Sequence, residues 1–237
     1  MNLFLDVETV PSQAPDAREL VRQGVKPPGT LKKPESIAAW WENEAEAAIE
    51  AEWRRQSLDG GTAGEIVGVA ICDDHDRQFV RCRRQGESEA ELLRDAFAAV
   101  EAWTEADAEA LLPGHADAFP LDDHHPVAHN ASFDLGFLWR RATVHGVPRP
   151  RWLPGPMARP GRDYTCTMQM WAGYGQRISL GALCRSLGVP SPKAAGFDGS
   201  NVFDAWLRGE YERIADYNLR DALAVREVYH RMLGLPR

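Results

Sequence analysis

The sequence has little cysteine, and its cysteines form no recognisable metal or disulfide framework. None of the four belongs to a C-x-x-C pair or lies near a histidine at zinc spacing, which argues against a structural zinc site. Cys72 and Cys82 could face each other across a predicted hairpin, but a disulfide is unusual in a reducing cytosol. We expect buried, reduced thiols at Cys72, Cys82, Cys166 and Cys184.

Long apolar runs are also absent. The stretch from Val67 to Cys72 is far too short to cross a bilayer, and Met1 to Asp6 lacks the basic start of a signal peptide. We therefore expect no membrane partner and a cytoplasmic location. An apolar share of 44% with eight tryptophans provides for a sizeable core and excludes wholesale disorder. A length of 237 residues allows one elaborated domain or two small ones, and we predict a single domain over residues 1–237.

Positive charge is in deficit, because 27 lysines and arginines stand against 35 aspartates and glutamates, for a net charge of −8. Taken alone, this deficit argues against a nonspecific binder of polyanions. The segment 135–197, however, holds nine basic residues and one acidic residue, a charge of 9 − 1 = +8, which leaves −16 for the remainder. A basic groove is therefore compatible with the acidic total. The basic residues are Arg140, Arg141, Arg149, Arg151, Arg159, Arg162, Arg177, Arg185 and Lys193, and the acid is Asp163.

The apolar periodicity predicts an α/β domain with a mixed sheet flanked by helices. A proline-marked stretch with helical spacing at its centre, residues 11–63, is predicted to be an insertion between the first two strands. The predicted strands cover residues 2–7, 66–72, 78–84 and 126–129, and the predicted helices cover residues 35–55, 88–103, 135–144, 180–187, 202–207 and 211–233.

Two carboxylates close the first predicted strand. Asp6 and Glu8 occupy positions i and i+2, so their side chains project from the same face. Mg²⁺ prefers such oxygen ligands and binds through a few carboxylates together with phosphate oxygens of a substrate. For an isolated D-x-E motif, two solvated acids at a strand end are the favoured explanation, so the motif alone does not indicate a metal site.

Two further motifs place acids at helical positions. Asp134 opens a helix directly after a strand, where the helix dipole alone favours an acid. Tyr217 and Asp221 are four residues apart on the last helix, so phenol and carboxylate share one face. A tyrosine hydroxyl can orient a water and a carboxylate can hold a cation beside it. The alternative is a packed tyrosine and an aspartate paired with a neighbouring arginine.

In this order, the three motifs resemble those of the DEDD, or DnaQ-like, 3′-to-5′ exonucleases. The tyrosine spacing is similar to the DEDDy branch, because the histidine branch has a histidine where this sequence has Asp216. The chain also resembles predicted stand-alone exonucleases of phages and bacteria that are related to the proofreading domain of family-B polymerases. This resemblance implies a ribonuclease-H-like fold. It covers nearly the whole chain and includes the segments 26–37, 64–70, 179–188 and 198–202.

The resemblance also implies a role for each site residue. Asp6, Glu8 and Asp221 would hold the divalent cation that activates the attacking water. Asp6 would bridge to a second cation supported through water by Asp134, and Tyr217 would orient the nucleophile. The cofactors would be two Mg²⁺ or Mn²⁺ ions, which stabilise the entering and leaving oxygens of a phosphodiester displacement. By the same analogy, the terminal nucleotide would meet Thr9, Asn130, Ser132 and Phe133.

The basic segment is the second candidate for substrate contact. Arg140, Arg141 and Trp152 combine positive charge with an aromatic ring, which suits a groove that follows a nucleic-acid backbone. The alternative is a solvated arginine-rich loop that pairs with the acidic ends of the protein. The histidine cluster of His124, His125 and His129 lacks thiolates and a second histidine motif, so we expect solvated or supporting roles rather than metal ligation.

We therefore predict a metal-dependent 3′-5′ exonuclease that releases nucleoside 5′-monophosphates from single-stranded nucleic acid, with DNA favoured over RNA. Transient polymerase or repair partners, in proofreading or DNA repair, would fit this activity. The alternatives are a catalytically inactive nucleic-acid-binding or polymerase-associated module of the same fold and an endonuclease or integrase-like enzyme, which would leave the tyrosine without a purpose.

Overall fold

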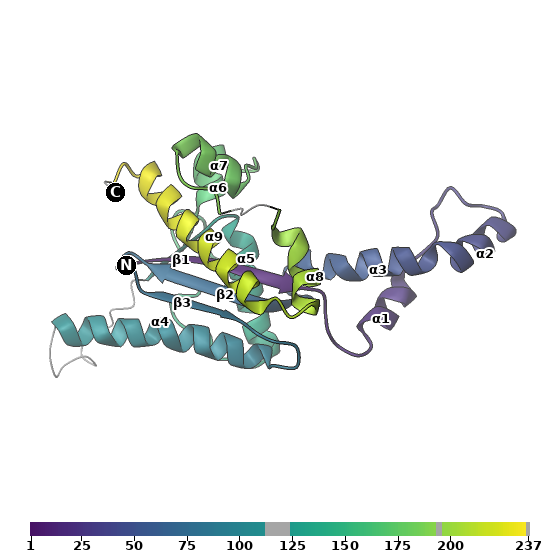
Figure 1. Cartoon of the computed structure of the whole chain (residues 1–237), viewed down its shortest axis with the longest axis horizontal. Coiled ribbons are helices and arrows are strands. Elements are labelled where there is room, and N and C mark those ends of the chain that lie inside the picture. Colours follow the sequence, from purple (N-terminus) through teal and green to yellow (C-terminus); the bar gives the residue numbers. More distant parts are fainter. Residues whose placement is uncertain (112–123, 193–195, 236–237) are drawn as a thin grey trace.

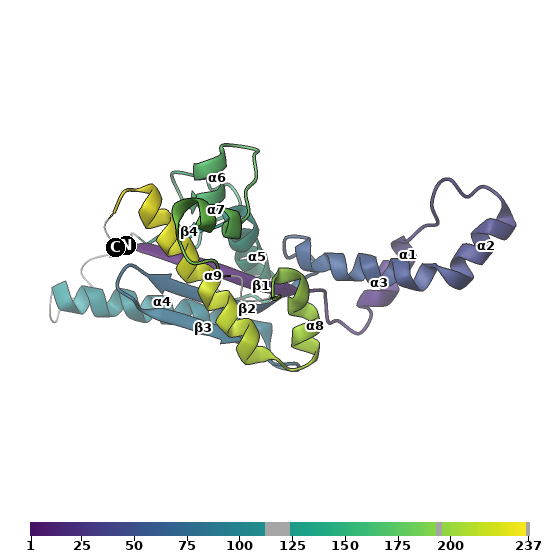
Figure 2. The same cartoon turned by 45° about the horizontal axis from the view of Figure 1, so that its top comes forward.

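The computed structural model describes residues 1–111, 124–192 and 196–235, which form a mixed five-stranded sheet with helices on both faces (Figures 1 and 2). The order of the strands is β3-β2-β1-β4-β5. The β1–β2 and β2–β3 pairs are antiparallel, whereas β1–β4 and β4–β5 are parallel. The predicted α/β class with a mixed sheet is therefore confirmed. The strands are β1 (Asn2–Val10), β2 (Glu65–Asp73), β3 (Gln78–Cys82), β4 (His125–Ala128) and β5 (Thr165–Cys166).

The central strand β1 is buried on both faces, and its alternation decides which side chains meet which helices. Leu3, Leu5 and Val7 join the main core cluster, which includes residues of α4 (Glu89–Leu111) and α5 (Ala131–Val144). Phe4 points to the opposite face and packs with Ala222 of α9 (Tyr211–Met232). Asp6 and Glu8 share this second face because they continue the same alternation. The central strand thereby presents both carboxylates to α9.

A register shift interrupts the β1–β2 ladder just beyond these carboxylates. Glu8 lies opposite Gly68, but Thr9 lies opposite Ile66, so Val67 is an extra residue on β2. This bulge changes the phase of the strand. As a result, Ile66 faces the same core cluster as Val69, although simple alternation would place the two side chains on opposite faces. Both halves of β2 can thus bury their apolar residues.

Three helices follow β1 and project from the sheet (Figure 1). We call residues 17–55 the helical arm, which consists of α1 (Ala17–Gly24), α2 (Pro34–Asn43) and α3 (Ala45–Arg55). Arg18 lies 3.1 Å from Glu50 across the α1–α3 contact, and Arg22 pairs with Glu46. The sequence predicts one helix over 35–55 and none over 17–24, whereas the structure divides the first at Glu44 and adds the second. That residues 11–63 are an insertion within the domain stays a prediction.

Two of the remaining helices pack against different halves of α9: α8 (Val202–Leu207) packs against its amino half and α7 (Leu180–Leu187) against its carboxyl half. The hydroxyl of Ser179 caps the start of α7 (Leu180–Leu187) by accepting from the N–H of Ala182 at 3.2 Å. Gly188 ends that helix with a φ of 65°, a conformation that favours glycine. The other elements are the 3₁₀ helices η1 (Gln56–Leu58) and η3 (Gly199–Asn201), and the helices α6 (Thr167–Ala172) and α8 (Val202–Leu207).

All four cysteines are free thiols. Cys72 lies opposite Gln78 and Cys82 opposite Gly68 in the β2–β3 ladder, so the two cysteines do not face each other as their spacing allowed. Within the described ranges, no helix is both long enough and apolar enough to span a membrane.

Candidate active site

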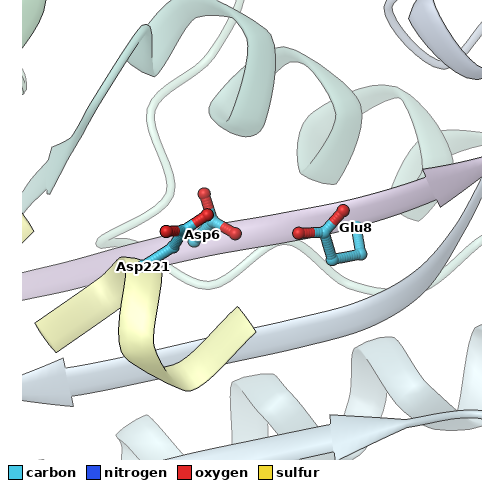
Figure 3. A group of neighbouring side chains, drawn as sticks. All are labelled: Asp6, Glu8 and Asp221. Carbon is cyan, nitrogen blue, oxygen red and sulfur yellow. The ribbon is translucent and has the colours of Figure 1, made fainter. Parts of the chain in front are cut away.

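Three carboxylates from two elements lie close together (Figure 3). Asp6 and Glu8 come from β1 and Asp221 comes from α9, and one oxygen of each lies within 4.8 Å of the others. Glu8 is 7% exposed and Asp221 is 8% exposed. This arrangement offers several hard oxygen donors in one small volume, which is the ligand set that a divalent cation of the Mg²⁺ type requires.

The electrostatics of the three carboxylates support the same conclusion. Burial raises the pKa of Asp6 well above its ordinary value, and the charge of Asp221 raises it further. Burial and Asp221 act in the same way on the pKa of Glu8. Such a cluster stays ionised only when cations compensate its charge, and without cations it takes up protons. The residues present therefore fit a divalent cation.

Asp134 lies beside this group in the first turn of α5. Its carboxyl group is 3% exposed, and Oδ1 accepts a hydrogen bond from the backbone N–H of Val7 at 3.2 Å. Val7 stands between the two carboxylates of β1, so this bond anchors Asp134 to the same strand, where its charge acts on Asp6 and Glu8. Burial raises the pKa of Asp134 to about 8.

This shift predicts a pH dependence of stability. Between about pH 4 and pH 8, the folded metal-free protein keeps a proton on Asp134 that the unfolded chain releases, so stability falls as pH rises through this window. The variant Asp134→Asn keeps an acceptor for Val7 but does not titrate. In EDTA, we expect it to melt at least about 3 °C above the wild type at pH 8 and near the wild type at pH 4. Melting curves that stay parallel at both pH values would contradict this account.

Tyr217 lies one turn before Asp221 on α9. Its ring packs edge-on against Phe197 with a centroid distance of 5.2 Å and is 5% exposed. Burial, followed by the charges of Asp221 and Glu8, raises the pKa of Tyr217. The side chain therefore stays a neutral phenol with a proton to donate at ordinary pH.

A cleft of about 260 Å³ opens beside these residues. Tyr217 and Asp221 line it together with Asn130, and Arg177 contributes the basic side chain among the described residues that line it. His129 also borders the cleft, where its Nε2 donates to the carbonyl of Ile178 at 2.9 Å and its Nδ1 lies 3.0 Å from the hydroxyl oxygen of Thr167. The cleft is thus lined by Asp221 of the acidic cluster, by the guanidinium group of Arg177 and by the exposed amide of Asn130.

Asn218 is a site residue that the sequence patterns did not reveal. Its Nδ2 donates to Asp6 Oδ2 at 2.6 Å, its side chain is fully buried, and its Oδ1 has no hydrogen-bond partner among the described residues. Gly68 makes room for it, because a Cβ there would lie 3.2 Å from Oδ1 of Asn218 and 3.1 Å from the Cβ of Glu8. A signal was available, since Asn218 precedes Asp221 by three residues and so shares its helix face.

We expect Asn218→Leu to weaken Mn²⁺ binding by about 10- to 100-fold, because residues that orient a ligand carboxylate have effects of this size. Isothermal titration calorimetry measures the affinity directly and does not depend on activity. Asn43→Leu provides a control, since Asn43 is exposed on the arm and its Nδ2 donates to the carbonyl of Ala39 within its own helix. Mn²⁺ affinity equal to that of the wild type in a folded Asn218→Leu protein would refute the assignment.

The four residues expected to meet a terminal nucleotide lie in different environments. Asn130 is exposed at the start of α5 with a φ of 63°, and Ser132 is exposed beside a pocket of about 190 Å³. Phe133 is half-buried, with its ring centroid 4.9 Å from that of Phe137. Thr9 donates its hydroxyl to the carbonyl of Ser57 at 2.6 Å, so this hydroxyl fastens β1 to the segment after the arm.

The three residues chosen from the basic segment also differ. Arg140 is exposed beside the same pocket as Ser132, and its Nη1 donates to the carbonyl of Gly60 at 2.6 Å. Arg141 is 7% exposed and pairs with the buried Glu89 at 2.7 Å. Trp152 is 6% exposed and packs edge-on against Phe97. The structure therefore gives Arg141 and Trp152 partners inside the core rather than an open surface. Lys193 lies outside the described residues.

Hydrogen bonds to hydroxyl or carbonyl groups hold each of the three predicted histidines. His124 Nε2 is 2.7 Å from the hydroxyl of Thr104, and His125 Nε2 is 2.9 Å from that of Thr165. Together with the contacts of His129, these bonds give each ring a hydrogen-bonded supporting position. The cation-binding group found among the described residues contains carboxylates only.

Comparison with known families bears on the second half of the chain. Residues 120–235 match the model of a family described as a predicted 3′-5′ exonuclease related to the exonuclease domain of PolB. The match supports an exonuclease-type domain. Comparison with curated proteins finds no match. An exonuclease is a hydrolase that acts on nucleic acid, and the mixed five-stranded sheet is consistent with the ribonuclease-H-like domain of such enzymes.

The matched segment covers part of the acidic site. It includes Asp134 and the Tyr217 to Asp221 turn, whereas Asp6 and Glu8 precede it. Folding brings the two sets together, because β1 pairs with β4 and α9 crosses β1. The matched segment therefore shares its acidic cluster with a strand that the family model does not reach.

Proposed function

We propose that the protein is a DEDDy-type, metal-dependent 3′-5′ exonuclease that releases nucleoside 5′-monophosphates from single-stranded nucleic acid, with DNA favoured. The meeting of Asp6, Glu8 and Asp221 within 4.8 Å carries this proposal. Asp134 and Tyr217 complete the expected set from neighbouring elements. We also propose a cytoplasmic role in proofreading or repair beside a polymerase.

Four carboxylates would bind the cations in this mechanism. Asp6, Glu8 and Asp221 would hold one divalent cation, and Asp6 with Asp134 would hold a second, as Mg²⁺ or Mn²⁺. When bound, these ions supply Lewis-acid stabilisation of the phosphate and lower the pKa of a water. Asn218 keeps the Asp6 carboxylate in place through its 2.6 Å bond.

Tyr217 is suited to positioning the nucleophile. Its phenol stays protonated, so its O–H can donate to the attacking water oxygen beside Asp221. The water oxygen forms a bond to phosphorus, and the bond from phosphorus to the 3′ oxygen of the preceding nucleotide breaks. The products are a nucleoside 5′-monophosphate and a strand with a new 3′-hydroxyl.

The burial of the site favours single-stranded ends. The scissile phosphate has to reach carboxylates that lie beside a cleft of about 260 Å³. A base-paired end resists that movement, because the terminal nucleotide has to leave its stack and its partner first.

A labelled oligonucleotide assay tests the proposal. A 5′-labelled single strand should shorten by one nucleotide at a time in Mg²⁺ or Mn²⁺ and remain intact in EDTA. Parallel deoxyribo- and ribo-oligonucleotides, single- and double-stranded, determine the preferred substrate. Cleavage of a circular single strand would indicate an endonuclease instead. Binding without product in either metal would indicate an inactive binding module.

A further inference from the structure

The lysines of this protein are concentrated in one place. The sequence has only four, and three of them, Lys26, Lys32 and Lys33, lie in residues 25–33, which connect α1 to α2. We call residues 25–33 the lysine loop. It contains no acidic residue and so carries a charge of +3 in a protein whose net charge is −8. All three lysines are exposed.

The arginines of the helical arm behave differently from these lysines. Arg18 and Arg22 pair with glutamates of α3, and Arg54 pairs with Glu50 at 2.7 Å and with Asp204 at 2.8 Å. Arg55 pairs with Glu52 at 3.0 Å. No ion pair involves the three lysines within the described part of the chain. The arginines therefore hold the arm together through ion pairs, whereas no described acidic residue pairs with the charges of the lysine loop.

The arm holds the lysine loop away from the sheet. Figures 1 and 2 both show the arm extending outward, with the loop between α1 and the far helix α2. Pro27, Pro28 and Pro34 limit the freedom of the loop, and the N–H of Leu31 donates to the carbonyl of Pro28 at 2.9 Å. The three charges are thus presented on a restrained segment.

The base of the arm is fastened next to the acidic cluster. The arm leaves the same end of β1 that carries Glu8, and the Thr9 hydroxyl bonds to Ser57 just after α3. Arg54 joins the arm to α8 through Asp204, and the indole N–H of Trp53 donates to the carbonyl of Ser12 at 2.9 Å. A strand that extends from the cluster beyond the end of β1 would therefore run toward the arm.

We propose that the lysine loop binds the sugar-phosphate backbone of the nucleic-acid substrate at a distance from the acidic cluster. This inference rests on the proposed function and adds a second contact to it. Lysine is a flexible point charge, so it binds phosphates without reading sequence. The eleven residues of α3 rise about 16 Å, the spacing of about five stacked nucleotides. Short substrates should not reach the loop.

The test replaces all three lysines with alanine. Binding of a fluorescent 30-nucleotide strand is measured in EDTA between 50 and 200 mM salt, where hydrolysis does not interfere. Loss of three phosphate contacts should reduce the slope of log K against log salt by about 2 and weaken binding by at least about tenfold at low salt. The charge-preserving variant, with arginine at the same three positions, should bind like the wild type.

Two outcomes separate this inference from the proposed function. A four-nucleotide substrate should be hydrolysed equally by the wild type and the alanine variant, because it does not span the arm. An unchanged salt slope with the 30-nucleotide strand would overturn the lysine-loop proposal, whatever the activity. Absence of hydrolysis of both substrates by the wild type would instead overturn the exonuclease, and the salt slope would still report on the loop.

Discussion

Replacing Asp221 with asparagine should reduce mononucleotide release by at least about 1,000-fold. Asp221 is the member of the acidic cluster that α9 supplies, and its charge acts on both carboxylates of β1. Divalent cations at such sites contribute several kcal/mol of transition-state stabilisation, and each 1.4 kcal/mol changes a rate about tenfold. Asp221→Asn keeps the size of the side chain but removes one negative ligand.

The matched control lies on the same helix. Asp216→Asn makes the same chemical change at an exposed position, where the carboxylate pairs with Arg220 at 3.2 Å. We expect its rate to stay within about twofold of the wild type, since exposed pairs contribute little. Rates are measured at saturating Mg²⁺ with a labelled single strand. Equal activity of both variants would remove Asp221 from the site.

The second large effect concerns stability rather than catalysis. Replacing Arg141 with methionine should destabilise the fold by about 3 to 5 kcal/mol, because it leaves the buried carboxylate of Glu89 without its cation. Arg141 donates to both oxygens of Glu89 at distances of 2.7 to 3.1 Å. Glu89 in turn accepts the N–H of Ile66 at 2.7 Å and contacts His145 at 2.8 Å. The pair thus connects α4, α5 and β2.

Thermal denaturation should show a melting temperature lower by about 10 °C for Arg141→Met. Arg140→Met serves as the control, because the side chain of Arg140 is exposed and donates to the carbonyl of Gly60. If Arg141→Met melts like the wild type but binds an oligonucleotide tenfold more weakly, the residue belongs to the substrate groove after all. The measurement therefore decides between the two roles.

Local patterns predicted most of the elements that build the sheet and α9. The alternation in β1 and the four-residue spacing of Tyr217 and Asp221 are short-range signals, and both survive folding because they reflect strand and helix geometry. That Asp6 and Asp221 would meet did not follow from spacing, since it depends on how α9 crosses β1. It came instead from the resemblance, and their roles in catalysis stay predictions.

Other features were invisible for physical reasons. β5 has only two residues, too few for an alternation, and α1 lies in a stretch where neighbouring prolines indicate loops. Arg141 and Arg140 are adjacent in sequence with the same charge, and only the rotation of α5 turns one toward Glu89 and the other outward. Asn218 illustrates the same limit, because its partner Asp6 is 212 residues away.

The bulge at Val67 has a consequence for how this protein can diversify. It lies where β2 leaves the arm and before β2 pairs with the carboxylate-bearing part of β1. Because the bulge resets the phase of β2, the residues on its arm side bury their apolar side chains while Gly68 stays opposite Glu8. On the lysine-loop proposal, exchanging the arm should therefore change how tightly strands are held, while the carboxylates of β1 keep their place opposite α9.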